Sequence, residues 1–261
     1  MTPIPILLYH RFNQSGDSLS TPPAVFEKQL SWLVNHGYRS LTLEEFEHRI
    51  SHPGDARGKK GVLITFDDGY VELPTVAAPA LRRHGLTGVA FLITSECSPA
   101  EAPGNVARPS GNHISWEQAR ALASEGVIEF QSHSHSHKRW GTGPDGSQEL
   151  TRDLATSLDV LTDQLRQPRS NFRHLAWPWG ICDRNWERIG RNLGFSHQHI
   201  VQRGAVTRPG HTMHLPRICF DGASARKFNT WMTLLSMPGG ANLSNRVFGT
   251  IRAHRQGMGY V

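Results

Sequence analysis

Short apolar segments alternate with amphipathic helical segments along the whole 261-residue chain, and this alternation constrains the fold more than any other feature. Strands are predicted at residues 4–9, 40–41, 61–65, 88–93, 127–131, 174–176 and 214–220. Alternating strands and helices are typical of a parallel sheet with helices outside it. So many strands in one domain indicate a barrel or a barrel-like sheet, in which functional side chains lie at the carboxyl ends of the strands.

The helices are marked by apolar residues at helical spacing and by two capping boxes. Thr42 pairs with Glu45 in the first capping box, and Ser115 pairs with Gln118 in the second. Helices are predicted near residues 26–36, 42–50, 72–84, 115–126, 150–165 and 185–193, with loops at residues 51–60 and 96–112. The tail beyond about residue 223 is weakly patterned. Because no repeat or linker interrupts the chain, residues 1–261 are expected to form a single domain.

Composition and charge argue against several classes of protein. Hydrophobic residues make up 38% of the chain and charged residues 19%, as in a globular protein with an adequate core. No run approaches about 18 apolar residues, so no transmembrane segment is expected. The net charge of +6 comes from scattered basic residues, which argues against a nucleic-acid partner. The N-terminus lacks a signal-peptide pattern, so a cytoplasmic location is expected, whereas a leader removed upstream would indicate the cell envelope or secretion.

The cysteines point to neither a zinc ribbon nor a disulfide framework. No two of Cys97, Cys182 and Cys219 form a Cys-x-x-Cys pair, and their number is odd. They are therefore expected to be buried or free thiols. The 15 histidines are numerous, and their positions matter more than their number.

Two adjacent carboxylates, Asp67 and Asp68, follow the strand predicted at residues 61–65. An Asp-Gly pair also occurs in ordinary surface turns, so the sequence of residues 65–70, TFDDGY, is not decisive by itself. Its position at the carboxyl end of a strand favours a functional role. Because neighbouring carboxylates repel each other, a cation bound by one of them, with the other free as a base, explains the pair best.

A run of alternating histidines and serines, His133 to His137, follows the strand predicted at residues 127–131. A solvated histidine-rich loop would have the same composition and can bind metal ions without a catalytic role. Imidazole, however, is the commonest side-chain ligand of catalytic zinc. Two histidines and one carboxylate form a set that leaves positions open for water and substrate, and Asp68 could supply the carboxylate.

Aromatic residues and a further histidine stand at the ends of two other strands. Trp177, Pro178 and Trp179 follow a short strand, where they either pack in the core or form a wall for a sugar ring or a small acyl group. His10 follows the first strand. A lone histidine is usually structural, but the position of His10 at a strand end favours a function.

Taken together, these motifs resemble those of the NodB-type polysaccharide deacetylase family, carbohydrate esterase family 4. Residues 65–69 match its Thr-Phe-Asp-Asp-Gly motif, and residues 133–137 match its His-Ser/Thr-x-x-His motif. Residues 177–180 are similar to its aromatic-Pro-aromatic-Gly motif. The resemblance covers roughly residues 4–221 and implies a distorted (β/α) barrel of about seven parallel strands with helices outside.

The resemblance also implies a divalent metal ion held by Asp68, His133 and His137, with His135 as a spacer and Asp67 as the catalytic base. Zinc is the expected ion, with nickel, cobalt and manganese as alternatives. Such an ion polarises a water molecule and the substrate carbonyl.

The sequence departs from the family pattern in two places. Ala176 stands where many members carry an arginine that orients the base, and Arg217 is the candidate replacement. Many members also carry a Leu-x-His motif near the C-terminus, which supplies the general acid. Residues 8–10 have this pattern at the N-terminus, similar to the circularly permuted branch that includes biofilm poly-N-acetylglucosamine deacetylases. His10 is therefore expected to be the acid, with His214 as the competing candidate.

The expected activity is removal of N-acetyl groups from a polysaccharide or oligosaccharide that contains amino sugars. The backbone N–H of Tyr70 is a candidate for stabilising the oxyanion, and Trp177 and Trp179 for confining the acetyl methyl or stacking on a sugar. Specificity is expected to reside in the loops at residues 96–112 and 140–146. Hydrolysis of an amide or cyclic imide in a non-sugar substrate is an alternative. A non-catalytic glycan-binding or metal-binding module is a third, against which the intact base argues.

Overall fold

The computed structural model describes residues 1–55, 58, 60–98, 112–141 and 143–257. Its centre is a barrel of parallel strands: β1 (Ile4–Tyr9), β3 (Gly61–Asp68), β4 (Gly88–Leu92), β5 (Ile128–Ser132), β6 (His174–Ala176), β7 (His197–Val201) and β9 (Leu215–Cys219). Hydrogen-bonded neighbours run from β3 in chain order to β9 and then to β1, which pairs again with β3 and closes the barrel. This confirms the predicted barrel of seven parallel strands.

Two short strands extend the sheet beyond the closed ring. β2 (Arg39–Ser40) runs parallel to the beginning of β3, and β8 (Ala205–Val206) runs antiparallel to β1. The C-terminal helix is fastened to β8, because Asn245 accepts a hydrogen bond from the backbone N–H of Ala205 and donates one to its carbonyl.

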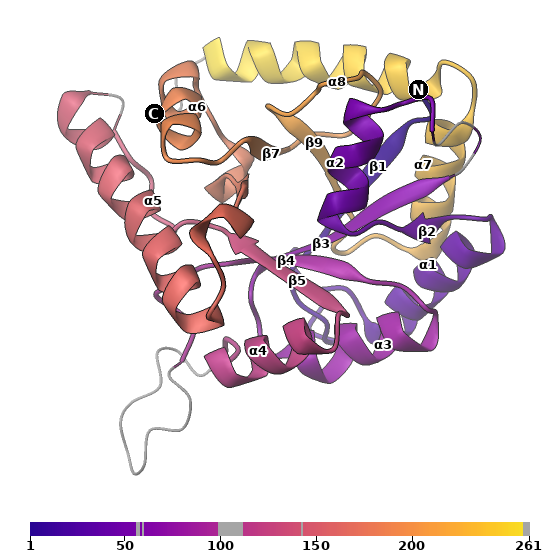
Figure 1. The fold of residues 1–261 in the computed structure, drawn as a ribbon. Coiled ribbons are helices and arrows are strands. Elements are labelled where there is room, and N and C mark those ends of the chain that lie inside the picture. Colours follow the sequence, from indigo (N-terminus) through magenta and orange to yellow (C-terminus); the bar gives the residue numbers. More distant parts are fainter. Residues whose placement is uncertain (56–57, 59, 99–111, 142, 258–261) are drawn as a thin grey trace.

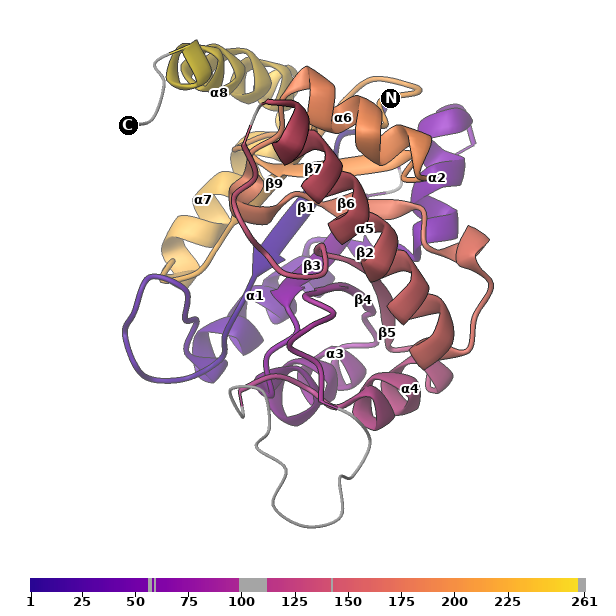
Figure 2. The ribbon, with the colours of Figure 1, turned by 90° about the vertical axis from the view of Figure 1, so that its left-hand side faces the viewer.

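Helices surround the strands on the outside (Figures 1 and 2). They are α1 (Pro23–Asn35), α2 (Leu43–Ser51), α3 (Ala78–Arg83), α4 (Trp116–Ser124), α5 (Pro144–Leu165), α6 (Arg184–Asn192), α7 (Ala225–Ser236) and α8 (Gly240–Gly257). Both predicted capping boxes are present, at the start of α2 and of α4. Within the described ranges, no helix combines the length and the apolar character needed to cross a membrane.

The hydrophobic core has two layers. The larger layer lies between the strands and the outer helices. The smaller one fills the barrel at the amino ends of its strands, where α2 contributes Leu43, Phe46 and Ile50 to a cluster that includes Ile6 and Leu63. Because α2 closes the amino end with apolar side chains, the polar residues at the carboxyl ends of the strands are left to form a site.

The structure corrects several sequence predictions. β3 is longer than predicted, so Asp67 and Asp68 lie within the strand, in register with Phe91 and Leu92 of β4. The helix predicted at residues 72–84 is divided into a π-helical turn (Leu73–Ala77) and α3. Proline has no backbone N–H and cannot continue the regular hydrogen-bond ladder, which explains the division in a segment that contains two prolines.

Other differences concern segments that the sequence left without structure. β7 was missed because two of its five residues are histidines, so it does not form an apolar run. The weakly patterned tail forms α7 and α8, and α7 buries Phe228, Met232 and Leu235 at helical spacing. Most of the loop predicted at residues 96–112 lies outside the described residues, as does residue 142 of the other loop expected to carry specificity.

Candidate functional site

A cavity of about 530 Å³ opens at the carboxyl ends of the barrel strands. It gathers side chains from the ends of β1, β3 and β5 and from the segment after β6. Its lining residues are His10, Leu19, Asp67, Asp68, Tyr70, Ile93, Glu96, His113, His133, Ser136, His137, Trp179, Gly180 and Val201. The side chains that the sequence selected from separate motifs therefore share one cavity, with the exceptions given below.

Asp67 is held by a two-pronged ion pair with Arg217 of β9. Nη1 of Arg217 donates to Oδ1 of Asp67 over 2.6 Å, and Nη2 donates to Oδ2 over 2.7 Å. Both side chains are almost completely buried. Although burial alone would raise the pKa of Asp67, the ion pair with Arg217 lowers it to about 2. Asp67 is therefore an ionised, firmly oriented proton acceptor at neutral pH.

Asp68, His133 and His137 converge on one point of the cavity. Oδ1 of Asp68 lies 3.4 Å from Nε2 of His133 and 3.9 Å from Nε2 of His137. The ligand atoms of all three residues lie within 4.8 Å of one another. Because metal–ligand bonds to nitrogen and oxygen are about 2 Å long, ligand atoms around one ion lie about 3 to 4 Å apart. The spacing therefore fits a single divalent ion.

Hydrogen bonds orient the ring of His133 and hold the backbone at His137. Nδ1 of His133 lies 2.8 Å from the carbonyl oxygen of Ala176, so Nδ1 carries the proton and Nε2 keeps a free lone pair. The backbone N–H of His137 donates to the hydroxyl of Ser134. The side chain of His135 instead turns away from the cavity, with Nδ1 2.9 Å from the hydroxyl of Thr94. His135 thus occupies the place of a spacer between the other two.

Three groups of side chains in the described part of the chain have the composition of a metal site. In two of them the carboxylate already has partners: Glu47 accepts hydrogen bonds from His174 and Arg173, and Asp221 pairs with His10. In the third group, Oδ1 of Asp68 is buried and has no hydrogen-bond partner among the described residues. A buried carboxylate oxygen without a partner is costly, and a cation would satisfy it. The Asp68 group therefore fits a metal ion best.

The backbone is strained around this group. Asp68, Ser134, His137 and Trp179 adopt positive φ angles between 51° and 69°, a region that side chains other than glycine rarely occupy. Such strain costs of the order of 1–3 kcal/mol per residue, and it accumulates at functional sites because the surrounding structure imposes it. The clustering of strained residues around Asp68 and His137 indicates that the surrounding structure imposes the geometry of this site.

His10 lines the cavity and pairs with Asp221, which follows β9. The two atoms Nδ1 of His10 and Oδ2 of Asp221 are 2.5 Å apart, and the backbone N–H of His10 also donates to this carboxylate. Burial alone would lower the pKa of His10, but the hydrogen bonds with Asp221 and Cys219 and the charge of Asp67 raise it well above its usual value. His10 is therefore protonated at neutral pH, with Nε2 as the nitrogen not engaged by Asp221.

His214, the competing candidate for the general acid, does not line the cavity. Nε2 of His214 lies 3.4 Å from a carboxylate oxygen of Glu187 on α6, and His214 is absent from the cavity lining. The structure thus brings His10, and not His214, beside Asp67. Asp221 was missed by sequence reasoning, although it is followed by a glycine at the end of a strand, as Asp68 is.

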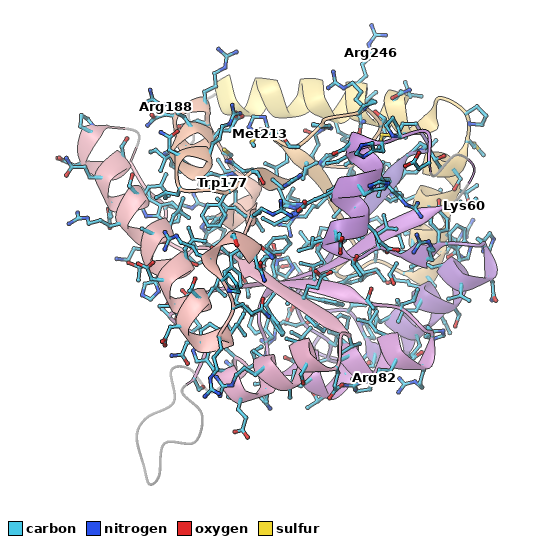
Figure 3. The ribbon with its side chains drawn as sticks, viewed as in Figure 1. Lys60, Arg82, Trp177, Arg188, Met213 and Arg246 are labelled. Carbon is cyan, nitrogen blue, oxygen red and sulfur yellow. The ribbon has the colours of Figure 1, made fainter. Side chains whose placement is uncertain are left out.

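The aromatic segment after β6 divides between the core and the cavity. Trp177 is labelled among the side chains in Figure 3. It is fully buried, and its indole N–H donates to Oε1 of Gln198. Pro178 is also buried. Trp177 and Pro178, which were candidates for contact with a ligand, are thus buried and absent from the cavity lining, as in the core-packing alternative. Trp179 is 55% exposed and lies with its ring centroid 5.0 Å from that of His137.

Tyr70 also lines the cavity. Its ring stacks on that of His113, with the centroids 4.9 Å apart, and Cζ of Arg11 lies 4.9 Å from the centroid of the Tyr70 ring. Burial and the negative charge of Asp68 raise the pKa of Tyr70 to about 12. The phenol is therefore neutral. Glu96 and His113 line the cavity without having been predicted, since neither stands in a recognisable motif.

Comparison with known proteins is consistent with the geometry. Residues 54–197, more than half of the chain, match the profile of the polysaccharide deacetylase family. The Bacillus subtilis protein YxkH is 28% identical over 232 residues, which cover 88% of this chain and 76% of that protein. A poly-beta-1,6-N-acetyl-D-glucosamine N-deacetylase of Staphylococcus epidermidis is 27% identical over 200 residues, which cover 74% of this chain and 65% of that protein. The deacetylase PplD of Streptococcus pyogenes, solved in complex with acetate, has a similar fold, with a TM-score of 0.75 and 24% identity over 88% of this chain and 98% of that chain.

Proposed function

Because the chain belongs to the polysaccharide deacetylase family, we propose that it is a metal-dependent hydrolase that removes N-acetyl groups from a polysaccharide or oligosaccharide of amino sugars. One observation carries the proposal: an ionised aspartate, a protonated histidine and a set of three metal ligands face the same cavity. Together these groups supply what metal-dependent hydrolysis of an amide needs, which is activation of water and a proton for the departing amine. The name of the Staphylococcus epidermidis relative supports an N-acetylglucosamine polymer as the substrate.

Asp68, His133 and His137 would hold the metal ion, and zinc is the ion that two histidines and one carboxylate suit well. When bound, a divalent ion supplies a Lewis acid for the carbonyl oxygen and lowers the pKa of a water molecule. His133 is prepared for this role because its Nδ1–H is bonded to a backbone carbonyl, which fixes the tautomer and directs Nε2 into the cavity.

Asp67 takes the proton from the attacking water, and Arg217 keeps its carboxylate oriented while this happens. His10 then transfers a proton from Nε2 to the departing amine nitrogen as the carbon–nitrogen bond breaks, so that acetate and an amine are the products. The backbone N–H of Tyr70 is proposed to stabilise the oxyanion, because Tyr70 follows Asp68-Gly69 at the edge of the cavity.

The pH dependence of the reaction provides a test of His10. Replacing Asp221 by asparagine removes the negative charge that keeps His10 protonated, so the pKa of His10 is expected to fall. The general acid is active when protonated, and activity is lost as the pH rises through its pKa. The alkaline limb of the profile of kcat/KM should therefore move to lower pH in the D221N variant. Asp55→Asn is the matched control, because Asp55 pairs with His48 on the surface, and it should leave the limb in place.

Trp179 is proposed to form a wall of the substrate site, whereas Trp177 supports the fold. Trp179→Ala should raise KM by about 2- to 10-fold, the equivalent of an aromatic contact of about 0.5–1.5 kcal/mol, with little change in the free energy of unfolding. Trp177→Ala should lower the free energy of unfolding by about 3–5 kcal/mol, because it leaves a large cavity. Chemical denaturation and steady-state kinetics measure the two effects. Equal effects of both variants on KM and stability would contradict the division.

Acetate release from N-acetylglucosamine oligomers and from poly-beta-1,6-N-acetylglucosamine, with and without a chelator, tests the proposal directly. We expect release that stops on chelation and returns when zinc is added. A panel of small amides and cyclic imides, assayed in parallel, covers the alternative substrate class. Release from the panel without release from any glycan would overturn the proposed substrate.

A further inference from the structure

A line of buried polar groups leads from the closed amino end of the barrel toward the site. It begins with Glu47 on α2, whose Oε1 lies 2.9 Å from Nε2 of His174 on β6. Nδ1 of His174 lies 2.9 Å from Nε2 of His199 on β7. His174 and His199 are at most 1% exposed. A line of buried polar side chains calls for an explanation, because it replaces side chains that would pack without hydrogen bonds.

The hydrogen bonds in this line have one direction. Glu47 is ionised, because its histidine and arginine partners outweigh the effect of burial and lower its pKa, so it accepts a hydrogen bond from Nε2–H of His174. Nδ1 of His174 is then an acceptor, so Nε2 of His199 must be the donor to it. Burial, together with His174 and Arg217, lowers the pKa of His199 well below its usual value, so its ring is neutral. Nδ1 of His199 is therefore an acceptor whose lone pair points into the barrel interior without a partner among the described residues.

Arg217 presents the complementary group. Its two Nη atoms bind Asp67, while its Nε–H is buried and has no hydrogen-bond partner among the described residues. Nδ1 of His199 is likewise buried without a partner in the described part of the chain. Both side chains pack against Phe91, with the Arg217 Cζ atom 5.2 Å and the His199 ring centroid 5.1 Å from the centroid of its ring. A donor and an acceptor without partners thus lie on the same aromatic side chain.

We propose that one buried water molecule accepts from Nε–H of Arg217 and donates to Nδ1 of His199, so that Glu47, His174 and His199 are positioning residues for Arg217 and, through it, for Asp67. Water is the fitting molecule because it can accept and donate at once, and buried waters occupy sites that offer polar partners of this kind. The effect on catalysis rests on the proposed function, whereas the water and the direction of the hydrogen bonds do not.

The geometry argues against reading Glu47, His174 and His197 as a second metal site. The rings of His174 and His197 are stacked, with centroids 4.4 Å apart and planes only 9° from parallel. A metal ion lies near the plane of each imidazole that binds it, so two stacked rings direct their lone pairs side by side and cannot meet at one ion. Stacking instead holds His174 in the plane that its hydrogen bonds with Glu47 and His199 require.

The first experiment does not depend on activity. A high-resolution crystal structure of the protein should contain a water molecule between Nε of Arg217 and Nδ1 of His199. Nitrogen-15 spectra of labelled histidines should show His174 and His199 as neutral rings that carry their proton on Nε2. A direct contact of Nε with another protein group, or a proton on Nδ1 of His199, overturns the proposal whether or not the protein is a deacetylase.

The second experiment measures kcat and KM in variants of the line. His199→Ala should lower kcat by about 10- to 100-fold, the range for residues that orient a catalytic group, and leave KM and metal content nearly unchanged. His199→Asn, whose side-chain oxygen can take the place of Nδ1, should restore much of kcat. A structural defect alone would lower stability without this rescue.

Glu47 gives an independent pair of variants if changes at His199 prevent folding. Glu47→Ala should lower kcat, because the proton of His174 is then free to move from Nε2 to Nδ1. Glu47→Gln keeps an acceptor for Nε2–H and should retain most of kcat. Glu44→Gln, an exposed glutamate on the same helix, is the control and should change neither. Wild-type kcat in His199→Ala and Glu47→Ala would overturn the positioning role. Absence of deacetylation in the wild-type protein would contradict the proposed function and leave the structural experiment to decide on the water.

Discussion

Replacing His133 by alanine is expected to remove the bound metal ion and to reduce deacetylation to the background rate. His133 would provide one of the three proposed ligand atoms, and its ring is fixed by the bond between Nδ1 and the carbonyl of Ala176. With one ligand lost, Asp68 and His137 alone would hold a divalent ion weakly, and the Lewis acid on which the reaction depends would be gone. Metal analysis of the purified variant, together with acetate release, measures both consequences.

His135→Ala is the matched control, because it removes a histidine from the same segment. Its Nδ1 contacts Thr94 and does not face the cavity, so the variant should keep its metal ion and most of its activity. Full metal occupancy in His133→Ala, or loss of metal in His135→Ala alone, would show that the ligands are assigned wrongly.

Asp67→Asn is expected to keep the metal ion and to lose about two to four orders of magnitude in kcat, the range for general acid–base catalysis. The substitution preserves the shape of the side chain but removes the charge and the proton acceptor. It also leaves Arg217 buried without its counter-charge, and breaking a buried ion pair costs about 3–5 kcal/mol of stability. Unfolding free energies, metal content and kcat should therefore be measured on the same preparation.

A surface pair separates the catalytic effect from the loss of an ion pair as such. Asp159 binds Arg169 at the exposed end of α5, and Asp159→Asn should change neither rate nor stability by a measurable amount. The double variant Asp67→Asn with Arg217→Met removes both buried charges, and it should regain stability without regaining activity. Recovery of the rate in this double variant would rule out Asp67 as the base.

The parts of the site that could be located from the sequence are those encoded in short segments. Asp67 and Asp68 directly follow a continuous apolar run, and the histidines of residues 133–137 follow another, so local patterns placed both at strand ends. Strand ends share one side of a parallel barrel, which is why the two segments meet in the cavity. The barrel itself was predictable for the same reason, since its strands read as apolar runs between helices.

Contacts between distant segments could not be derived in this way. The partner of His10 is Asp221, 211 positions away in the chain, and only the closed ring of strands brings them together. The aromatic segment shows the same limit on a smaller scale. Trp179 faces the cavity because its backbone adopts a φ of 61°, which no periodic pattern predicts, while Trp177, two residues earlier, turns into the core.

β7 illustrates a third kind of failure. Of its two buried histidines, His199 takes part in the buried hydrogen-bond line and His197 stacks on His174, so polar residues occupy positions where a pattern of apolar residues is expected. The helices of the C-terminal tail were not predicted for another reason. The buried residues of α7 have helical spacing, but they are few and polar residues lie between them. Tertiary contacts, rather than local preference, give both segments their structure.

Closure of the barrel by the first strand also determines when the protein can become active during its synthesis. β1 leaves the ribosome first, yet its partner β9 is made more than 200 residues later, as the pairing of Leu7 with Ile218 requires. Long-range strand pairs of this kind form late, because the chain between them must be ordered first. A nascent chain that ends before β9 would already carry Asp67, Asp68, His133 and His137, but neither Arg217 nor Asp221. The proposed base and acid therefore acquire their partners only after residues 217–221 have been synthesised, so a shorter nascent chain lacks the complete site.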